Sequence, residues 1–189
     1  ILRNLKDLID FKKRQPGKVT LLLGNHDMHY MEYPDYRCSG FNRFFQPDYT
    51  ELFRDNRNLF QAAVQFGDYL FTHAGLSRSF VNHNLTAYAR LIEARQIQVA
   101  DLQNGLHNSE NQTVLHPVSV MRGGADPFGG ITWADYRETS VDLLPGYHQV
   151  VGHTPRKKIT KVEGDNSSIT YIDVLDTVEE FFSGNIYAP

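Results

Sequence analysis

The stretch VTLLLGNHD, residues 19–27, decides the fold of this chain. Its first five residues form a nearly continuous hydrophobic run that does not alternate, so residues 18–23 are predicted to form a strand buried on both faces. The strand opens directly into a loop that carries an amide, an imidazole and a carboxylate, on Asn25, His26 and Asp27. Polar groups of this kind at a strand end are typical of a functional site on a rigid scaffold.

The residues before this strand support the same architecture. Residues 2–14 place apolar side chains at helical spacing, and Pro16-Gly17 ends that helix. Helix, short turn and apolar strand are the second half of a β-α-β unit. The strand that should precede the helix is not present in these residues.

Two further histidines occupy the same context as the first site. His73 follows the apolar run 69–72, and His153 follows the run 149–152. Each lies next to a glycine or another small residue. Three strand ends that each deliver a nitrogen or oxygen ligand predict a metal site at one rim of a β-sheet core.

The chemistry of these side chains suggests separate roles. Asn25, His73 and His153 form a neutral ligand set, which holds a divalent ion weakly unless a carboxylate joins it. His26 would point away from its neighbour and could protonate a leaving oxygen, provided that an acid orients it. Asp27 is one candidate for that acid, and an acid outside this chain is another.

Three more residues are candidates for substrate binding. Arg122 and Arg137 could each bind phosphate through two parallel hydrogen bonds. His29 follows the first motif closely, and surface or supporting packing is as good an interpretation for it as substrate contact.

The remaining pattern predicts one domain over residues 1–189, of the α/β class with mixed sheets and flanking helices. Hairpin turns are predicted at Gly67-Asp68 and around 164–167. A surface excursion, a candidate lid, is expected within 84–130. In chain order we expect a short helix at 48–57, paired strands at 59–66 and 69–73, one or two helices at 84–102, a surface segment at 103–130, a strand at 148–151, paired strands at 157–163 and 168–174, and a last strand at 178–182.

Composition excludes several classes of protein. The formal charge of −3 and the lack of a basic stripe argue against nucleic-acid binding. No apolar run approaches the ~20 residues that span a bilayer. Cys38 is the only cysteine, so no internal disulfide is possible, which fits a cytoplasmic protein.

Three motifs taken together resemble the calcineurin-like metallophosphoesterases, in particular the phosphoprotein-phosphatase-like group with the bacterial diadenosine-tetraphosphate hydrolases. They are Gly24–Asp27, Thr72–Ser77 and Val151–Pro155, in the family's order. Residues 132–135 also resemble a tryptophan-containing segment of the family, and residues 24–29 resemble its GNHDxH form.

The resemblance implies a four-layer α-β-β-α sandwich and a dinuclear metal centre. It implies that Asn25, His73 and His153 bind one metal and that His26 is the proton donor. The family's two earlier acidic motifs, D-x-H and G-D-x-x-[DE]-R-G, do not occur before Gly24. The chain therefore resembles a member without its first β-α-β portion, and at most one well-formed metal site is expected in it.

The expected function is metal-dependent hydrolysis of phosphoric esters, with two divalent ions (Mn, Fe or Zn) in the intact protein. A phosphoprotein or a nucleotide would be the phosphorylated partner. Hydrolysis of dinucleoside polyphosphates is the alternative within enzymes. A non-catalytic binding module that keeps the fold is the alternative from another class.

Overall fold

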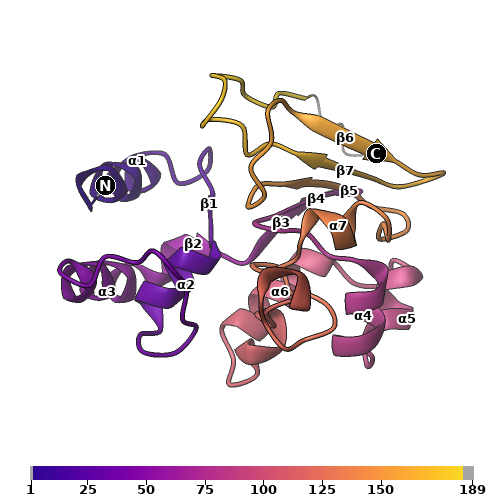
Figure 1. Cartoon of the computed structure of the whole chain (residues 1–189), viewed down its shortest axis with the longest axis horizontal. Helices are drawn as coiled ribbons and strands as arrows, with labels where there is room; N and C mark the ends of the chain where they lie inside the picture. The colour runs from indigo at the N-terminus through magenta and orange to yellow at the C-terminus, as the bar shows by residue number, and fades with distance from the viewer. Residues whose placement is uncertain (1, 185–189) are drawn as a thin grey trace. The chain divides into compact units, whose positions relative to one another are not determined.

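The computed structural model describes residues 2–184 and divides into two compact units, Ile1–Gln61 and Ala62–Pro189 (Figure 1). Each unit has a hydrophobic cluster of its own. The candidate residues are shared between the units, with Asn25, His26 and Asp27 in the first, and His73 and His153 in the second. The prediction of a single domain over residues 1–189 stays a prediction.

The first unit contains the predicted helix–turn–strand sequence. The Nζ of Lys12 donates to the carbonyls of Pro16 and Val19, at 2.8 and 2.6 Å, and so holds the turn between helix and strand. The strand is shorter than predicted, because only Leu21–Leu22 form a ladder, in parallel with Phe60–Gln61. The elements are α1 (Leu2–Arg14), β1 (Leu21–Leu22), α2 (Asn25–Met31), α3 (Gln46–Asp55), η1 (Arg57–Leu59) and β2 (Phe60–Gln61).

The core of the first unit forms where the apolar faces of its helices meet. Ile9 of α1, Leu23 after β1 and Phe53 of α3 are all buried. Met28 places α2 in the same cluster. The helix predicted at 48–57 begins two residues earlier, with a proline in its first turn, where a missing N–H costs nothing.

The second unit is built on a five-stranded mixed sheet in the order β3-β4-β5-β7-β6 (Figure 1). β3 and β4 pair as an antiparallel hairpin, and so do β6 and β7, as the turn residues predicted. β4, β5 and β7 are parallel neighbours. The strands are β3 (Ala63–Phe66), β4 (Tyr69–Thr72), β5 (His148–Val151), β6 (Thr160–Glu163) and β7 (Ser168–Tyr171). The mixed α/β class is confirmed.

Short helices cover one side of this sheet in Figure 1. The prediction of one or two helices at 84–102 is confirmed, because α5 (Ala89–Glu93) and the first part of α6 (Val99–His107) lie in this segment, whereas α4 (Arg78–Asn84) precedes it and was not predicted. α4 begins at Arg78 because the Ser77 hydroxyl accepts the N–H of Phe80 at 3.0 Å, a typical N-cap. η2 (Gln112–Leu115), η3 (Val120–Arg122) and α7 (Tyr136–Thr139) follow.

Three further expectations need correction. The run 59–66 is interrupted at Ala62, since β2 pairs with β1 and β3 pairs with β4. The segment 103–130 is not simply a surface excursion, because Leu115 is fully buried in the main cluster. Residues 178–182 form no strand, and Phe181 is 78% exposed, so no face of this segment is buried to favour pairing.

No helix within residues 2–184 is long and apolar enough to cross a membrane.

Candidate metal centre and proton donor

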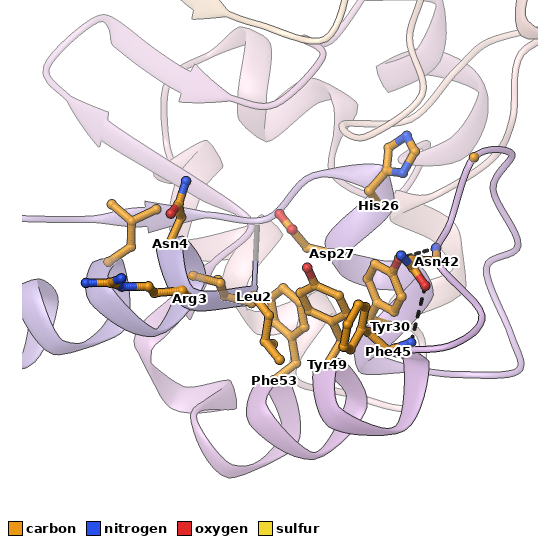
Figure 2. A pocket seen from close by; sticks show the side chains of 13 residues that line it. Leu2, Arg3, Asn4, His26, Asp27, Tyr30, Asn42, Phe45, Tyr49 and Phe53 are labelled. Carbon is orange, nitrogen blue, oxygen red and sulfur yellow. Dashed lines mark hydrogen bonds between the residues drawn. The ribbon is translucent and has the colours of Figure 1, made fainter.

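Asn25, His26 and Asp27 occupy the first turn of α2 and point in different directions. Asn25 is buried, with 5% of its surface exposed, whereas His26 is exposed. Successive helical residues are rotated by about 100°, which separates neighbouring side chains. Figure 2 shows the Asp27 carboxylate and the His26 ring on different sides of α2.

Asp27 is used by the backbone at the start of α2. Its Oδ2 accepts the N–H of Gly24 at 2.8 Å. Burial raises the pKa of Asp27 to about 6, and the Gly24 hydrogen bond lowers it only in part. This carboxylate therefore caps the helix. The imidazole of His26 is contacted by a different residue.

That residue is Cys38, which the sequence analysis did not connect with the site. Its Sγ lies 3.4 Å from Nδ1 of His26. Cys38 is 8% exposed, and burial together with the charge of Asp27 raises the pKa of its thiol. The one available signal was that Cys38 is the only cysteine of the chain.

His29 lies in the interior of the first unit. It is 1% exposed, and its ring centroid lies 4.2 Å from that of Phe41 and 5.7 Å from that of Tyr33. Burial is the main cause that lowers the pKa of His29, against the backbone of Tyr36, which raises it. His29 also lines a cavity of about 380 Å³ that includes Arg37.

A larger cavity of about 700 Å³ adjoins the start of α2 (Figure 2). His26 and Asp27 line it, and residues of α1 form one side. The opposite wall is aromatic, and the rings of two of its residues stack with centroids 4.5 Å apart. These wall residues are Tyr30, Phe45, Tyr49 and Phe53.

In the second unit, His73 and His153 come together at one edge of the sheet. They follow β4 and β5, which are parallel with Thr72 opposite Val151. Parallel strands end at the same edge, so residues 80 apart in the sequence become neighbours. Nε2 of His73 lies 2.9 Å from Nδ1 of His153.

The backbone helps to hold this pair of imidazoles. The N–H of Gly152 donates to the carbonyl of His73 at 2.9 Å. His153 adopts φ 63°, a left-handed conformation that is uncommon for a residue with a side chain. Such a conformation at a strand end suggests a functional constraint.

The pair fits part of a metal ligand set. At 2.9 Å the two nitrogens are at hydrogen-bond distance, and metal–nitrogen bonds of about 2.0–2.1 Å would hold them slightly further apart, at about 3.3 Å around a tetrahedral ion. The set is incomplete in the second unit, because no group of three or more His, Cys, Asp or Glu that could hold an ion occurs within residues 2–184. Asn25 belongs to the first unit.

Both candidate arginines are paired with one buried carboxylate. Asp135, 5% exposed, accepts from Nε of Arg137 at 2.8 Å and lies 2.9 Å from Nε of Arg122. Arg122 also donates to the hydroxyl of Thr154, the residue after His153. The side chain of Arg122 therefore contacts the residue that follows His153 and is 22% exposed, whereas that of Arg137 is 62% exposed.

The aromatic residue of the same segment also touches the pair. The Trp133 ring lies edge-on to that of His153, with centroids 5.8 Å apart. Sequence reasoning singled out residues 132–135 by resemblance and did not foresee that Asp135 holds both arginines.

Comparison with known proteins agrees with these motifs. Residues 1–157 match the calcineurin-like phosphoesterase family. The chain belongs to this family. No curated protein sequence matches the chain. Membership supports a phosphoesterase function at the level of the family.

One solved structure shares the fold at low sequence identity, and a second matches with a lower TM-score. A mutant of a cold-active protein tyrosine phosphatase is 18% identical with a TM-score of 0.53, over 92% of this chain and 54% of that one. The cold-active protein tyrosine phosphatase of a psychrophilic Shewanella species is 18% identical with a TM-score of 0.47, over 84% and 50%. This calcineurin-like chain thus spans about half the length of these structures, and the first likeness is consistent with the metallophosphoesterase fold.

Proposed function

We propose that the intact protein is a metal-dependent phosphoric ester hydrolase of the protein-phosphatase type, with a dinuclear centre. The observation that carries the proposal is the convergence of His73 and His153, whose ring nitrogens lie 2.9 Å apart where two parallel strands end. Two imidazoles close to metal-ligand separation are expected in a family of metallophosphoesterases.

Asn25, His73 and His153 would hold one divalent ion, which is Mn, Fe or Zn in our proposal. A bound ion would supply Lewis-acid stabilisation of phosphate charge and a more acidic water. The neutral ligands leave the charge of the ion available to an anionic substrate, and further ligands would come from acidic residues outside this chain.

The remaining roles fall to side chains of this chain. As a water oxygen bonds to phosphorus and the ester P–O bond breaks, His26 gives its proton to the departing oxygen. Arg122, which donates to Thr154 and is ion-paired with Asp135, would bind phosphate oxygens with its guanidinium. Arg137, which is more exposed, is assigned to substrate contact, and His29, which is 1% exposed, to the supporting packing that was its alternative interpretation.

Leaving-group dependence tests the proton donor. Replacing His26 by Ala should lower kcat/KM for phenyl phosphate by about 10²–10⁴-fold, the range for a general acid. p-Nitrophenyl phosphate has a good leaving group that needs little protonation, so its turnover should fall much less. Equal losses on both substrates would remove the donor role.

Metal binding tests the histidine pair without relying on turnover. Titration calorimetry with Mn²⁺ should show weaker binding for His73→Ala and His153→Ala, because each removes one ligand. His83→Ala, at another histidine of the second unit, serves as the control. Two tightly bound ions in the 189-residue chain would contradict the expectation of at most one well-formed site.

The aromatic cavity favours a second candidate, hydrolysis of dinucleoside polyphosphates. Of the aromatic residues in its wall, Phe45 is exposed and suited to stack a nucleobase, whereas Tyr30 and Tyr49 are buried and stack on each other. Comparing diadenosine tetraphosphate with a phosphopeptide, with added Mn²⁺, separates the two substrates. Absence of hydrolysis of either substrate, in both this chain and the intact protein, would instead favour a binding module that keeps the fold.

A further inference from the structure

The loop between α2 and α3 surrounds the smaller cavity of the first unit, whose volume of about 380 Å³ lies in the usual range of ligand sites. We propose that this cavity is an oxyanion site that holds a second phosphoryl group of the substrate while the first is hydrolysed beside His26. The proposal rests on the proposed function, because it presupposes a phosphorylated substrate. The principal donors are the guanidinium groups of Arg37 and Arg43, which both line the cavity.

The charge of the lining is positive and uncompensated. No acidic side chain is among the described residues that line the cavity. In the part of the chain that the structure describes, neither Arg37 nor Arg43 forms an ion pair, whereas both candidate arginines of the second unit do. Burial lowers the pKa of His29, so that ring is largely neutral at pH 7 and the two arginines supply the charge. Guanidinium groups with free donors are well suited to bind phosphate.

Aromatic packing holds one of the two guanidinium groups at the cavity. The Cζ of Arg43 lies 5.6 Å from the centroid of the Phe41 ring, within the range of a cation–π contact. The Phe41 ring packs in turn against the buried His29, with centroids 4.2 Å apart. His29 therefore supports Phe41, and Phe41 supports the guanidinium of Arg43.

Hydrogen bonds hold the loop that carries both arginines. The hydroxyl of Tyr30 accepts the N–H of Asn42 at 2.7 Å. The guanidinium of Arg54, in α3, donates to the carbonyls of Met31 and Tyr33 at 3.3 and 3.2 Å. A loop tied to both flanking helices loses less conformational entropy when a ligand binds, which favours binding.

The cavity lies close to the proposed proton donor. His26 and His29 are three residues apart in α2, and side chains at this spacing are neighbours, with about 5–6 Å between Cβ atoms. After burial and the backbone of Tyr36, the charge of His26 is a further influence on the pKa of His29, which it lowers. A polyphosphate chain, or a peptide with two phosphorylated side chains, could therefore place one phosphoryl group at each position.

The first test measures binding without turnover. In the metal-free 189-residue chain labelled with ¹⁵N and ¹³C, inorganic pyrophosphate should shift the ring resonances of His29, whereas chloride at equal ionic strength should not. Arg37→Gln and Arg43→Gln should each weaken binding by about tenfold or more, because each removes charge-assisted hydrogen bonds. Both side chains are exposed, so the variants should keep the fold.

A matched control separates the cavity from the overall charge. Arg14→Gln removes the same charge from an exposed position at the end of α1, outside the lining of the cavity. It should change the affinity for pyrophosphate by less than about twofold, because exposed charges at a distance are screened by salt. An equal loss in Arg14→Gln and in the two cavity variants would overturn the proposed site.

The second test measures KM in the intact protein with Mn²⁺. The double variant Arg37→Gln/Arg43→Gln should raise KM for substrates with two or more phosphoryl groups by about tenfold or more, and leave kcat within about threefold. KM for p-nitrophenyl phosphate, which has one phosphoryl group, should change by less than about twofold. Diadenosine tetraphosphate and a doubly phosphorylated peptide are compared, and the substrate affected identifies the source of the second phosphoryl group.

The outcomes separate this proposal from the proposed function. If pyrophosphate leaves the His29 resonances unchanged, or the double variant changes KM for neither substrate, while p-nitrophenyl phosphate is hydrolysed, the oxyanion site is overturned and the proposed function stands. If the intact protein hydrolyses none of the three substrates, the proposed function fails, and the substrate role of the cavity fails with it.

Discussion

Removing the carboxylate of Asp135 should destabilise the second unit by a predictable amount. Asp135 is 5% exposed, ion-pairs with Arg122 and Arg137, and accepts the backbone N–H of Arg137 at 2.9 Å as the N-cap of α7. Loss of an N-cap costs about 1 kcal/mol. The pair with exposed Arg137 adds little, because solvent screens it, and the pair with largely covered Arg122 adds about 1–2 kcal/mol.

Two substitutions separate these contributions. Asp135→Ala loses the cap and both ion pairs, so its free energy of unfolding should fall by about 2–3 kcal/mol. Asp135→Asn keeps a good capping oxygen and loses only the charge, so its free energy of unfolding should fall by about 1–2 kcal/mol.

Urea denaturation followed by the fluorescence of Trp133, the only tryptophan, measures the unfolding of this unit. The slope of free energy against urea should stay unchanged in all three proteins, so that the midpoints report stability. If Asp135→Asn matches the wild type, the ion pairs contribute nothing. If it is as unstable as Asp135→Ala, the cap contributes nothing.

The same variants predict a dependence on pH. Burial alone would raise the pKa of Asp135, but the hydrogen bonds from Arg137 and the charges of Arg122 and Arg137 hold it below its ordinary value. A carboxyl group with a lowered pKa stabilises the fold above its unfolded pKa of about 3.9 and loses this effect as pH falls through the folded pKa. The difference between wild type and Asp135→Asn should therefore be constant from pH 8 to about pH 5 and shrink below about pH 4.

Two further predictions concern stability. Gly130→Ala should lower the free energy of unfolding by more than about 2 kcal/mol, because its Cβ would lie 2.0 Å from a backbone carbonyl oxygen. Gly105→Ala, which has open space around it in α6, should raise the free energy of unfolding by about 0.5–1 kcal/mol. Thermal unfolding compares the two variants, and equal midpoints would refute the packing argument. Because burial raises the pKa of Asp27 to about 6, the first unit should lose stability as pH rises from about 4 to 6, by at most about 3 kcal/mol. Asp27→Asn should abolish that loss in denaturation followed by circular dichroism, and an unchanged pH profile would contradict it.

Elements with strong local signals were predicted well. The strand at 148–151 has the predicted bounds, and the turn at Gly67 adopts φ 56°, as glycine allows. The helix at 2–14 also agrees, because its apolar spacing is clear. Its end is set by a local proline and glycine rather than by distant contacts.

Elements that depend on packing were predicted less well. Helix α4 (Arg78–Asn84) was not predicted, because its seven residues show little hydrophobic periodicity and its N-cap at Ser77 is a signal from a single residue. Residues 178–182 have β-forming side chains but no strand to pair with among residues 2–184, and β propensity depends on such a partner. Of the candidate site, the sequence placed the residues on strand ends but could not measure their separations.

The amino-acid sequence by itself determined which side chains follow the apolar strands, because the strand pattern and the motif are local in the chain. Only the tertiary structure decided their partners. The parallel pairing of β4 with β5 joins His73 to His153, loop packing brings Cys38 to His26, and one buried carboxylate collects Arg122 and Arg137. The reason is physical: the contacts of His26, His73 and Arg122 join residues 12 to 80 positions apart, and their geometry is set by pairing and packing that no local pattern encodes.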